Sequence, residues 1–285
     1  MAKGKWSKIL FWVIVVALIG VIVWCLWQIG YKLVTDAQDK SDYDALAASK
    51  NAVDEVRPTD YTYVPTTGEG DSEDFTEPEG DTSSTDEPPA DLPEGIIRKC
   101  AAVYALNNDT VGWIEIPGTS IDYPVVQSPY QANFYLRRNI YKEKATCGTI
   151  YVREKCDVWG PSDNVTIYGH NMRNGTMFAD LHKYEKKEFW ENSPLVFFDT
   201  LYELHTYEIF AVFISSADLS KGFSYHTFDD AENAAEFDEF VKTCKDLSLY
   251  DTGITPQYGE KLITLSTCDK SIDNGRLVVV ARRIM

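Results

Sequence analysis

The sequence of 285 residues lacks the basic surface that a nucleic-acid-binding protein needs. It contains 44 acidic and 27 basic residues, and its formal net charge is −17. Binding to phosphates requires clustered lysine and arginine side chains, so we expect no nucleic-acid partner. Hydrophobic residues make up 44% of the chain, which is enough to build a core and excludes wholesale disorder.

Nucleotide and metal motifs are also missing. The chain contains no G-x-G-x-x-G motif and no P-loop, and its expected elements do not alternate as strand, helix and strand. Its six cysteines include no C-x-x-C pair, and its four histidines include no close pair. This pattern does not fit a zinc ribbon or another metal motif, and we expect neither a cofactor nor a metal site.

One long apolar run, residues 9–31, contains no charged residue. As a helix it is about 34 Å long, enough to cross a bilayer core of about 30 Å. Three lysines within residues 1–8 precede it and only Lys32 follows it closely, which predicts a cytoplasmic N-terminus. A cleaved signal peptide fits less well, because the run is long and no A-x-A-like site follows. We therefore expect a single-pass anchor in the lipid bilayer, with the rest of the chain outside.

Residues 32–91 are expected to form a stalk. Fourteen acids and one arginine give residues 54–94 a net charge of −13, and Pro, Gly, Ser and Thr are frequent there. Such a segment has little apolar surface to bury and repels itself, so it should be extended. Residues 36–53 hold good helix formers without Pro or Gly, and favour a continued helix. The stalk would lift the folded part, residues 92–285, off the membrane.

Residues 92–285 are expected to form one domain that is mostly β. A short helix begins it, and further helices are expected at 176–190 and 230–247. Eight segments are rich in β-branched and aromatic residues: 111–116, 121–126, 147–152, 164–169, 195–199, 205–215, 261–267 and 276–284. Closure removes exposed sheet edges, so we expect a closed barrel of about eight strands, with an N-terminal helix and a long helix before the last two strands.

Among the cysteines, Cys268 has the position of a nucleophile. It ends the apolar strand KLITLSTC and is followed by polar sequence, so a rigid element holds its thiol at the solvent edge. A structural cysteine is the alternative. Cys25 lies in the apolar run, and five cysteines remain outside it, so at least one is unpaired. Cys147 and Cys156 are either a disulfide or two buried free thiols.

His170 and Arg276 also lie at strand ends. His170 follows a strand in the polar segment IYGHNMRNG, and Arg276 begins the last strand, eight residues after Cys268. If those two strands pair as a hairpin, the guanidinium lies near the thiol, where it stabilises a thiolate or an oxyanion. A surface arginine is the alternative. His182 and His205 fall inside an expected helix and strand, where packing or surface roles are expected.

These motifs together resemble the sortases, cysteine transpeptidases that anchor proteins to Gram-positive cell walls. The family combines a His in a short loop, a Cys that closes a T-L-x-T-C strand and an Arg on the next strand. The matching residues here are His170 in IYGHN, Cys268 in TLSTC and Arg276 in GRLVVVARR. The resemblance covers residues 95–285. The resemblance is greatest to class B. The Ser in TLSTC, the helix before the first strand and the helix at 230–247 all support this class. The segments VGWIEIPGTSIDYPVVQ and NFYLRRN also resemble class B sequences.

The resemblance implies an acyl-transfer mechanism. The Cys268 thiolate attacks a backbone carbonyl in the C-terminal sorting motif of a secreted protein and forms a thioester. His170 protonates the leaving amine and later deprotonates the incoming amino group of a peptidoglycan precursor. Arg276 stabilises the oxyanion. The expected location is the outer face of the cell membrane.

Four further residues are candidates for contacts in the site. Ser266 lies on the same strand face as the nucleophile, or is a plain strand serine. Leu136, in NFYLRRN, and Tyr225, in FSYHTF, fall where class B enzymes contact the sorting peptide. The family often has an Asn a few residues before the Leu, and this chain reads QAN there, which leaves the register open. Asp269 would orient Arg276, or is a simple loop acid.

Other functions fit part of the same pattern. A hydrolytic cysteine endopeptidase would use the same Cys, His and Arg. A non-enzymatic surface domain on a stalk would bind a ligand with its barrel and keep Cys268 as a structural residue. An L,D-transpeptidase fits less well, because the Ser-His-Gly-Cys run of those enzymes is missing.

Overall fold

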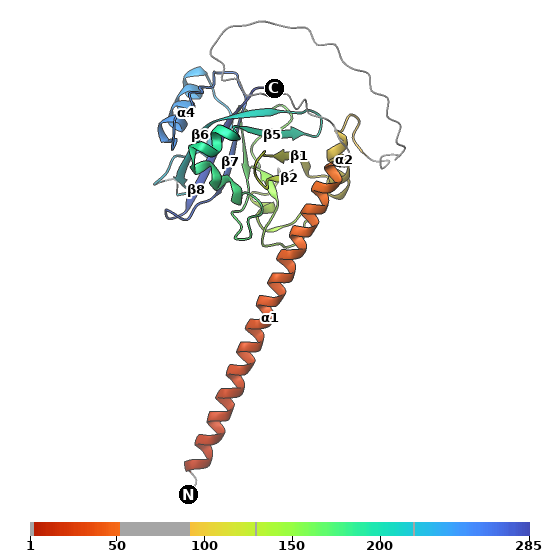
Figure 1. Cartoon of the computed structure of the whole chain (residues 1–285), viewed down its shortest axis with the longest axis vertical. Coiled ribbons are helices and arrows are strands. Elements are labelled where there is room, and N and C mark those ends of the chain that lie inside the picture. Colours follow the sequence, from red (N-terminus) through yellow and green to blue (C-terminus); the bar gives the residue numbers. More distant parts are fainter. Residues whose placement is uncertain (1–2, 52–91, 129, 219) are drawn as a thin grey trace.

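The computed structural model describes residues 3–51, 92–128, 130–218 and 220–285 (Figure 1). Most of the expected stalk therefore lies outside the described residues. The described strands are β1 (Thr110–Glu115), β2 (Asp122–Gln127), β3 (Ile150–Val152), β4 (Asn164–Tyr168), β5 (Leu195–Thr200), β6 (Thr206–Ser216), β7 (Leu262–Cys268) and β8 (Gly275–Arg283). The described helices are α1 (Lys3–Asn51), α2 (Arg98–Leu106), α3 (Lys187–Asn192) and α4 (Ala234–Leu247), with 3₁₀ turns η1 (Phe134–Arg137), η2 (Ala179–Glu185) and η3 (Tyr225–Thr227).

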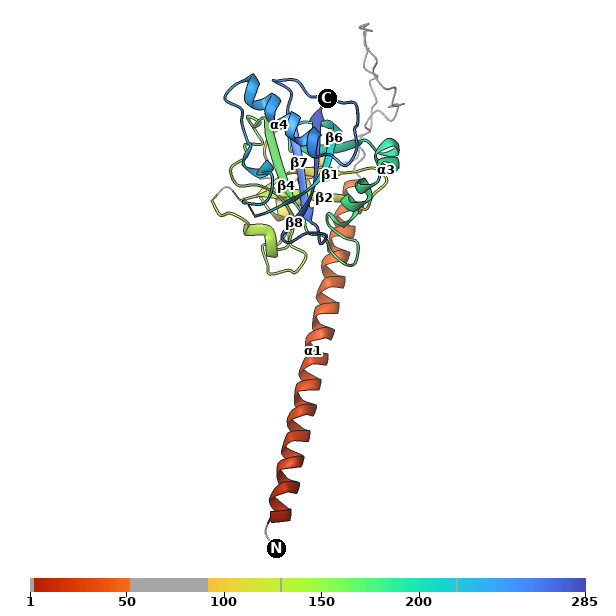
Figure 2. The same ribbon diagram turned by 90° about the vertical axis from the view of Figure 1, so that its left-hand side faces the viewer.

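The eight strands close into one barrel in the order β1-β2-β3-β4-β7-β8-β6-β5 (Figures 1 and 2). The pairs β2–β3 and β4–β7 are parallel, and the other pairs are antiparallel. Each expected strand is present with bounds within three residues of those predicted. The expected mostly β barrel is therefore confirmed. The parallel pair β4–β7 is the feature that brings distant segments together at the functional end.

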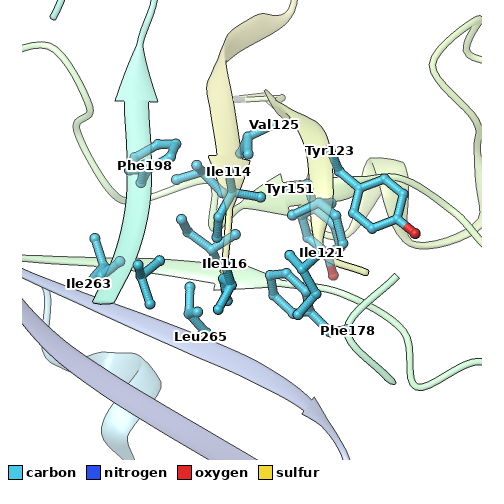
Figure 3. Packing of buried hydrophobic residues seen from close by; sticks show 14 of the residues in the cluster. Ile114, Ile116, Ile121, Tyr123, Val125, Tyr151, Phe178, Phe198, Ile263 and Leu265 are labelled. Atoms are coloured by element: carbon cyan, nitrogen blue, oxygen red, sulfur yellow. The ribbon is translucent and has the colours of Figure 1, made fainter. Parts of the chain in front are cut away.

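The barrel has two apolar layers, one inside it and one outside beneath α4. Figure 3 shows the interior, where Ile114, Val125 and Leu265 from three different strands pack together. Strand β8 contributes to both layers, because Leu277, Val279 and Ala281 face the interior cluster while Val278 and Val280 face the outer one. Burial on both faces explains its continuous apolar sequence.

Helix α4 covers the outer layer as the helical spacing of its apolar residues predicts. Phe237, Phe240, Val241 and Cys244 are buried against β6 and β8. Asn233 caps its start, because its side chain accepts hydrogen bonds from the backbone N–H groups of Ala235 and Glu236. The helix therefore begins four residues later than the predicted 230–247.

The helix expected at 176–190 is wrong as a single element. The structure has η2 there, followed by an extended Lys186 and then the short α3. Phe178, Leu181 and Tyr184 are all fully buried and lie three residues apart. A 3₁₀ turn has three residues per turn and places such a set on one side, whereas an α-helix would rotate them apart.

Helix α1 is a straight rod that runs from the N-terminus to the barrel (Figure 1). By length and composition it is the one helix in the described part of the chain that is able to cross a membrane. Its last turns, which fall within the expected stalk, dock on the folded domain. Tyr43 is buried and its hydroxyl donates to the carbonyl of Gly148 at 3.1 Å. Lys50 lies 2.8 Å from Glu115 and 2.6 Å from Asp122.

Candidate active site

The last two strands place the candidate nucleophile beside the candidate oxyanion group. Cys268 and Arg276 are direct partners in the antiparallel ladder of β7 and β8. Both side chains are half-buried at the end of the hairpin. The guanidinium of Arg276 donates to the carbonyl of Gly275 at 2.8 Å, so the end of the side chain is held against the turn. The hairpin expected from the spacing of the two residues is present.

The parallel neighbour of β7 brings His170 to the same end. Tyr168, the last residue of β4, pairs with Ser266. The next residue, Gly169, continues the contact, because its N–H donates to the Ser266 carbonyl at 3.2 Å and its carbonyl accepts from the Thr267 hydroxyl at 2.8 Å. The chain then leaves the sheet at His170.

Gly169 is required at this point because two side chains crowd its α-carbon. A Cβ at this position would lie 2.5 Å from Cδ1 of Ile150 and 2.6 Å from Cγ of Phe178. Both contacts are far shorter than van der Waals distance, and both partners belong to the packed interior. The approach of the His170 loop to the barrel therefore depends on the missing side chain.

A cavity of about 270 Å³ opens at this end of the barrel. The three residues expected to carry the chemistry and three expected to contact substrate all line it: His170, Cys268, Arg276, Ser266, Leu136 and Tyr225. These six residues supply a thiol, an imidazole, a guanidinium, an aliphatic side chain and two hydroxyls to the lining of one cavity. This arrangement is suited to nucleophilic attack on a carbonyl with a proton donor and an oxyanion stabiliser at hand.

The environment of His170 favours its neutral form. Burial lowers the pKa of the imidazole below its ordinary value, and the charges of Arg137 and Arg276 lower it further. The Leu136 carbonyl acts in the opposite direction, because Nε2 of His170 lies 2.7 Å from that oxygen. A carbonyl only accepts, so Nε2 carries the proton and donates it.

Two buried hydroxyls form a fixed pair in the cavity wall. The Tyr225 hydroxyl and the Ser266 Oγ are 2.7 Å apart, and both side chains are buried. Burial raises the pKa of Tyr225, so the phenol stays protonated. Tyr225 comes from η3 and Ser266 from β7, so this hydrogen bond ties the loop before α4 to the strand that bears the nucleophile.

Asn133 and Tyr151 line the cavity and were missed as site residues. Asn133 has a φ of 56°, a left-handed conformation that asparagine tolerates better than most residues. Its Oδ1 accepts from the Tyr151 hydroxyl at 2.8 Å. Asn133 is the asparagine of QAN, three residues before Leu136, and its presence there was the indication in the sequence that it belongs to the site.

The contacts of Asp269 favour a simple loop acid, which is the alternative to an orienting role toward Arg276. Its carboxylate accepts from the N–H of Ser271 at 2.8 Å and lies 3.9 Å from Nδ1 of His182. Burial raises the pKa of Asp269, but the hydrogen bonds from Ser271 outweigh it, so the pKa lies below its ordinary value. Within the described ranges, the hydrogen bonds of Arg276 go to backbone carbonyls and none goes to Asp269.

His182 lies closer to the site than its place in an expected helix suggested. Its Nε2 is 3.2 Å from the carbonyl oxygen of Cys268. With Glu185 and Asp269 it forms the group that comes nearest to a metal-ligand set among the described residues. Hydrogen bonds already engage these atoms, since Nδ1 of His182 lies 2.5 Å from Oε1 of Glu185. No step of the chemistry is assigned to a metal there.

The other cysteines of the barrel have environments unlike that of Cys268. Cys147 and Cys156 are buried free thiols, which answers the question left open by the sequence. Burial raises the pKa of both, and the charges of Asp39 and Asp229 add to the effect. Both thiols are therefore unreactive at neutral pH.

Comparison with known proteins points to one family. The sortase domain family model matches residues 114–284. Sortase B of Listeria monocytogenes is 34% identical over 181 residues, which cover 63% of this chain and 71% of that protein. Sortase B of Staphylococcus aureus is 28% identical over 181 residues, which cover 63% of this chain and 72% of that protein.

Solved structures show the same similarity. Clostridium perfringens sortase B has a TM-score of 0.59 at 33% identity, with 65% of this chain and 98% of that chain covered. Sortase B of Listeria monocytogenes has a TM-score of 0.56 at 34% identity, with 63% and 97% covered. A Staphylococcus aureus sortase B–substrate complex has a TM-score of 0.67 at 22% identity, with 88% and 98% covered, which is a likeness of fold.

Proposed function

Because the chain belongs to the sortase family and is a class B cysteine transpeptidase, we propose that Cys268, His170 and Arg276 carry out its reaction. The observation that carries this assignment is that all three side chains line one cavity of about 270 Å³. They come from β7, from the loop after β4 and from β8, so three rigid elements hold them. Rigid support of this kind keeps reacting groups aligned.

The first half-reaction forms a thioester on Cys268. The thiol passes its proton to His170, and Sγ attacks the carbonyl carbon of the sorting peptide. Arg276 donates hydrogen bonds to the oxyanion that develops. When this intermediate collapses, the C–N bond breaks and the imidazolium of His170 gives its proton to the leaving amine. The thiol proton thus ends on the leaving amine, and the acyl group remains on the sulfur of Cys268.

The second half-reaction transfers the acyl group to an amine. The acceptor nitrogen attacks the thioester carbon, and neutral His170 takes the proton that this nitrogen loses. Collapse expels the Cys268 thiolate, which recovers a proton from the imidazolium. Burial and the nearby arginines lower the pKa of His170, which keeps it neutral and ready to act as the base in this step.

The substrates are a C-terminal sorting signal of secreted proteins and an amino group of a peptidoglycan precursor. Leu136, Tyr225 and Ser266 are proposed to contact the sorting peptide, since they line the cavity that holds the nucleophile. A structural neighbour from Staphylococcus aureus is described as a sortase B–substrate complex, which supports a peptide site in this fold.

The proposed location is the outer face of the cell membrane. Residues 9–31 of α1 would span the bilayer, with residues 1–8 in the cytoplasm on the basis of their lysines. Residues 32–91 would form the acidic connection and residues 92–285 the catalytic domain.

Product analysis tests this function. The full chain in detergent micelles is incubated with a panel of sorting-signal peptides and a small amine, beside the Cys268→Ala variant. Mass spectrometry should find the amine joined to the new carboxyl end of the peptide, and only with Cys268 present. Hydrolysed product alone, with no amine incorporated at any concentration, would identify a peptidase instead.

A further inference from the structure

The backbone carbonyl of Cys268 points away from β8. The N–H of Asp269 donates to the Gly275 carbonyl at 2.9 Å, which places one further ladder hydrogen bond just beyond the last strand pair, while the Gly275 N–H donates to Ile272 in the turn. Hydrogen-bonded and non-hydrogen-bonded pairs alternate, so Cys268 and Arg276 form a non-hydrogen-bonded pair. The Cys268 carbonyl therefore faces the other neighbour of β7, which is β4.

A side chain takes the place of the next backbone hydrogen bond between β4 and β7. Gly169 donates its N–H to Ser266, and two residues further on the regular parallel pattern would join the N–H of residue 171 to the Cys268 carbonyl. The side-chain Nδ2 of Asn171 donates to that carbonyl instead, at 3.0 Å. The backbone is thus free to bend at His170 while the contact to β7 is kept.

His182 and Glu185 fix the orientation of the Asn171 amide. Nδ2 of Asn171 lies 2.8 Å from Nε2 of His182. The carboxylate of Glu185 accepts from Nδ1 of His182 at 2.5 Å, so in the neutral imidazole Nε2 has a lone pair that accepts. Nε2 and the Cys268 carbonyl oxygen, which lie 3.2 Å apart, are then both acceptors, and the Asn171 amide between them donates to each. A flipped amide would turn its oxygen toward both acceptors and repel them.

We infer that Asn171, oriented by His182 and Glu185, is a positioning residue that holds the Cys268 end of β7 at a fixed place relative to His170. These three side chains are called the amide clamp below. The inference rests on the proposed function, in which Cys268 and His170 react together. One end of the clamp is Asn171, which directly follows His170 in the chain. The other end is the backbone carbonyl of Cys268. A shift of about 1 Å between such groups can cost roughly 100-fold in rate.

The clamp acts on the chemistry and not on substrate binding. Within the described residues, neither Asn171 nor His182 lines the cavity that holds the catalytic groups. Their loss should therefore lower kcat and leave KM nearly unchanged. A residue that only supported the fold would lower the melting temperature without this separation of the two constants.

The test measures kcat and KM of the full chain with a cleaved sorting peptide and an amine. Asn171→Asp keeps the shape but removes the N–H donor, and Asn171→Ala removes the amide. Each should lower kcat about 10- to 100-fold with KM within about twofold. Asn174→Ala is the matched control in the same loop, because among the described residues the Asn174 side chain accepts hydrogen bonds only from Thr176. A kcat within about twofold of the parent for both Asn171 variants would overturn the inference.

Variants of His182 test whether this side chain orients the Asn171 amide. His182→Gln keeps a polar group able to accept and should retain most of kcat, whereas His182→Leu should lose as much as Asn171→Ala. The double variant Asn171→Ala/His182→Leu should be no slower than Asn171→Ala alone, because each single substitution already removes the same amide clamp. Losses that multiply in the double variant would contradict the clamp.

Hydrogen exchange separates failure of the clamp from failure of the proposed function. In the full chain, Asn171→Ala should raise amide exchange in residues 168–172 and at Asp269, and Asn174→Ala should not. This readout needs no activity. If the parent makes no product, or if Cys268→Ala makes as much product as the parent, the proposed function fails. The hydrogen-exchange rates still test the amide clamp in that case. Unchanged exchange in Asn171→Ala would overturn the clamp even in an active enzyme.

Discussion

The charge state of His170 is set by its immediate neighbours. Burial and the guanidinium groups of Arg137 and Arg276 lower the pKa of its imidazole, and one carbonyl opposes them. In the proposed mechanism, the thiol proton of Cys268 passes through His170 to the leaving amine. Neutral His170 then takes a proton from the acceptor amine and returns it to the thiolate.

Removal of the exposed neighbour Arg137 tests this electrostatic account. In Arg137→Gln the pKa of His170 should rise toward its ordinary value, because one of the positive charges that lower it is gone. The limb of the pH profile of kcat/KM that reports His170 should move to higher pH in the same variant. NMR titration of the His170 ring measures the pKa directly.

The control for this titration is Lys242→Gln, which removes a positive charge from the exposed face of α4. It should leave the titration of His170 where it is. A pKa that stays constant or falls in Arg137→Gln would show that the charge of Arg137 does not lower the pKa of the His170 imidazole.

The strands and the hairpin were predictable because local sequence determines them. Strand β8 contains three consecutive valines, and the seven residues between Cys268 and Arg276 fit a hairpin. The side-chain pattern does not predict an element whose backbone conformation depends on packing against the barrel. Phe178, Leu181 and Tyr184 fit a 3₁₀ turn only because the barrel surface buries all three, which a helical pattern in the sequence does not reveal.

Contacts between distant segments were beyond the sequence. Asn171 and Cys268 lie 97 residues apart, and their hydrogen bond depends on where the β4–β7 ladder stops. His182 was expected to pack within a helix, although its ring nitrogen reaches the Cys268 carbonyl. The sequence left two roles open for Asp269, one toward Arg276 and one as a loop acid, and the turn directs its carboxylate toward Ser271 and His182. Such directions depend on turn geometry and not on residue type.

The loop after β4 should not tolerate a side chain at Gly169. In Gly169→Ala the new methyl would meet Ile150 and Phe178 within 2.6 Å, so the loop or the interior must shift. We expect a loss of about 1–3 kcal/mol in the free energy of unfolding, as for other overpacked sites. We also expect a large fall in kcat, because His170 is the next residue. Chemical denaturation and steady-state kinetics measure the two effects.

Gly160→Ala is the comparison for this substitution. Its new methyl would meet only Oδ2 of Asp157, the end of a side chain, at 3.3 Å. Stability and kcat should both stay near those of the parent. Equal behaviour of the two variants would mean that the tight approach of the His170 loop has no consequence.

At the scale of the whole molecule, one continuous helix joins the apolar segment to the catalytic barrel. Helix α1 ends against β2 and α2, where Tyr43 is buried and Lys50 lies between two carboxylates. The barrel therefore has a defined orientation relative to the helix that would cross the membrane. An extended stalk beginning at residue 32 would not provide this.

Loss of Tyr43 should release the helix and expose Cys147. The thiol of Cys147 lies 3.4 Å from the Asp39 carboxylate of α1 and is 5% exposed. Burial of a large side chain contributes about 1.5–3 kcal/mol, so Tyr43→Ala should raise the undocked fraction roughly 10- to 100-fold. Labelling of Cys147 by a thiol reagent, followed by peptide mass analysis, should accelerate by a similar factor.

The comparison variant for the docked helix is Gln38→Ala, because Gln38 is exposed on the same helix. It should leave the labelling rate of Cys147 unchanged. A rate that is the same in Tyr43→Ala and in the parent would show that α1 does not cover this part of the barrel.

The central claim is that acyl transfer passes through a thioester on Cys268, and intact mass spectrometry tests it most directly. The full chain in detergent is mixed with a sorting peptide that it cleaves, without any amine, and is then quenched in acid. The account predicts an adduct with the mass of the N-terminal peptide fragment on the segment that contains Cys268. Added amine should convert this adduct to amide product, and Arg276→Ala should form it far more slowly. Product formation by the Cys268→Ala variant, or an adduct that amine does not discharge, would contradict the account.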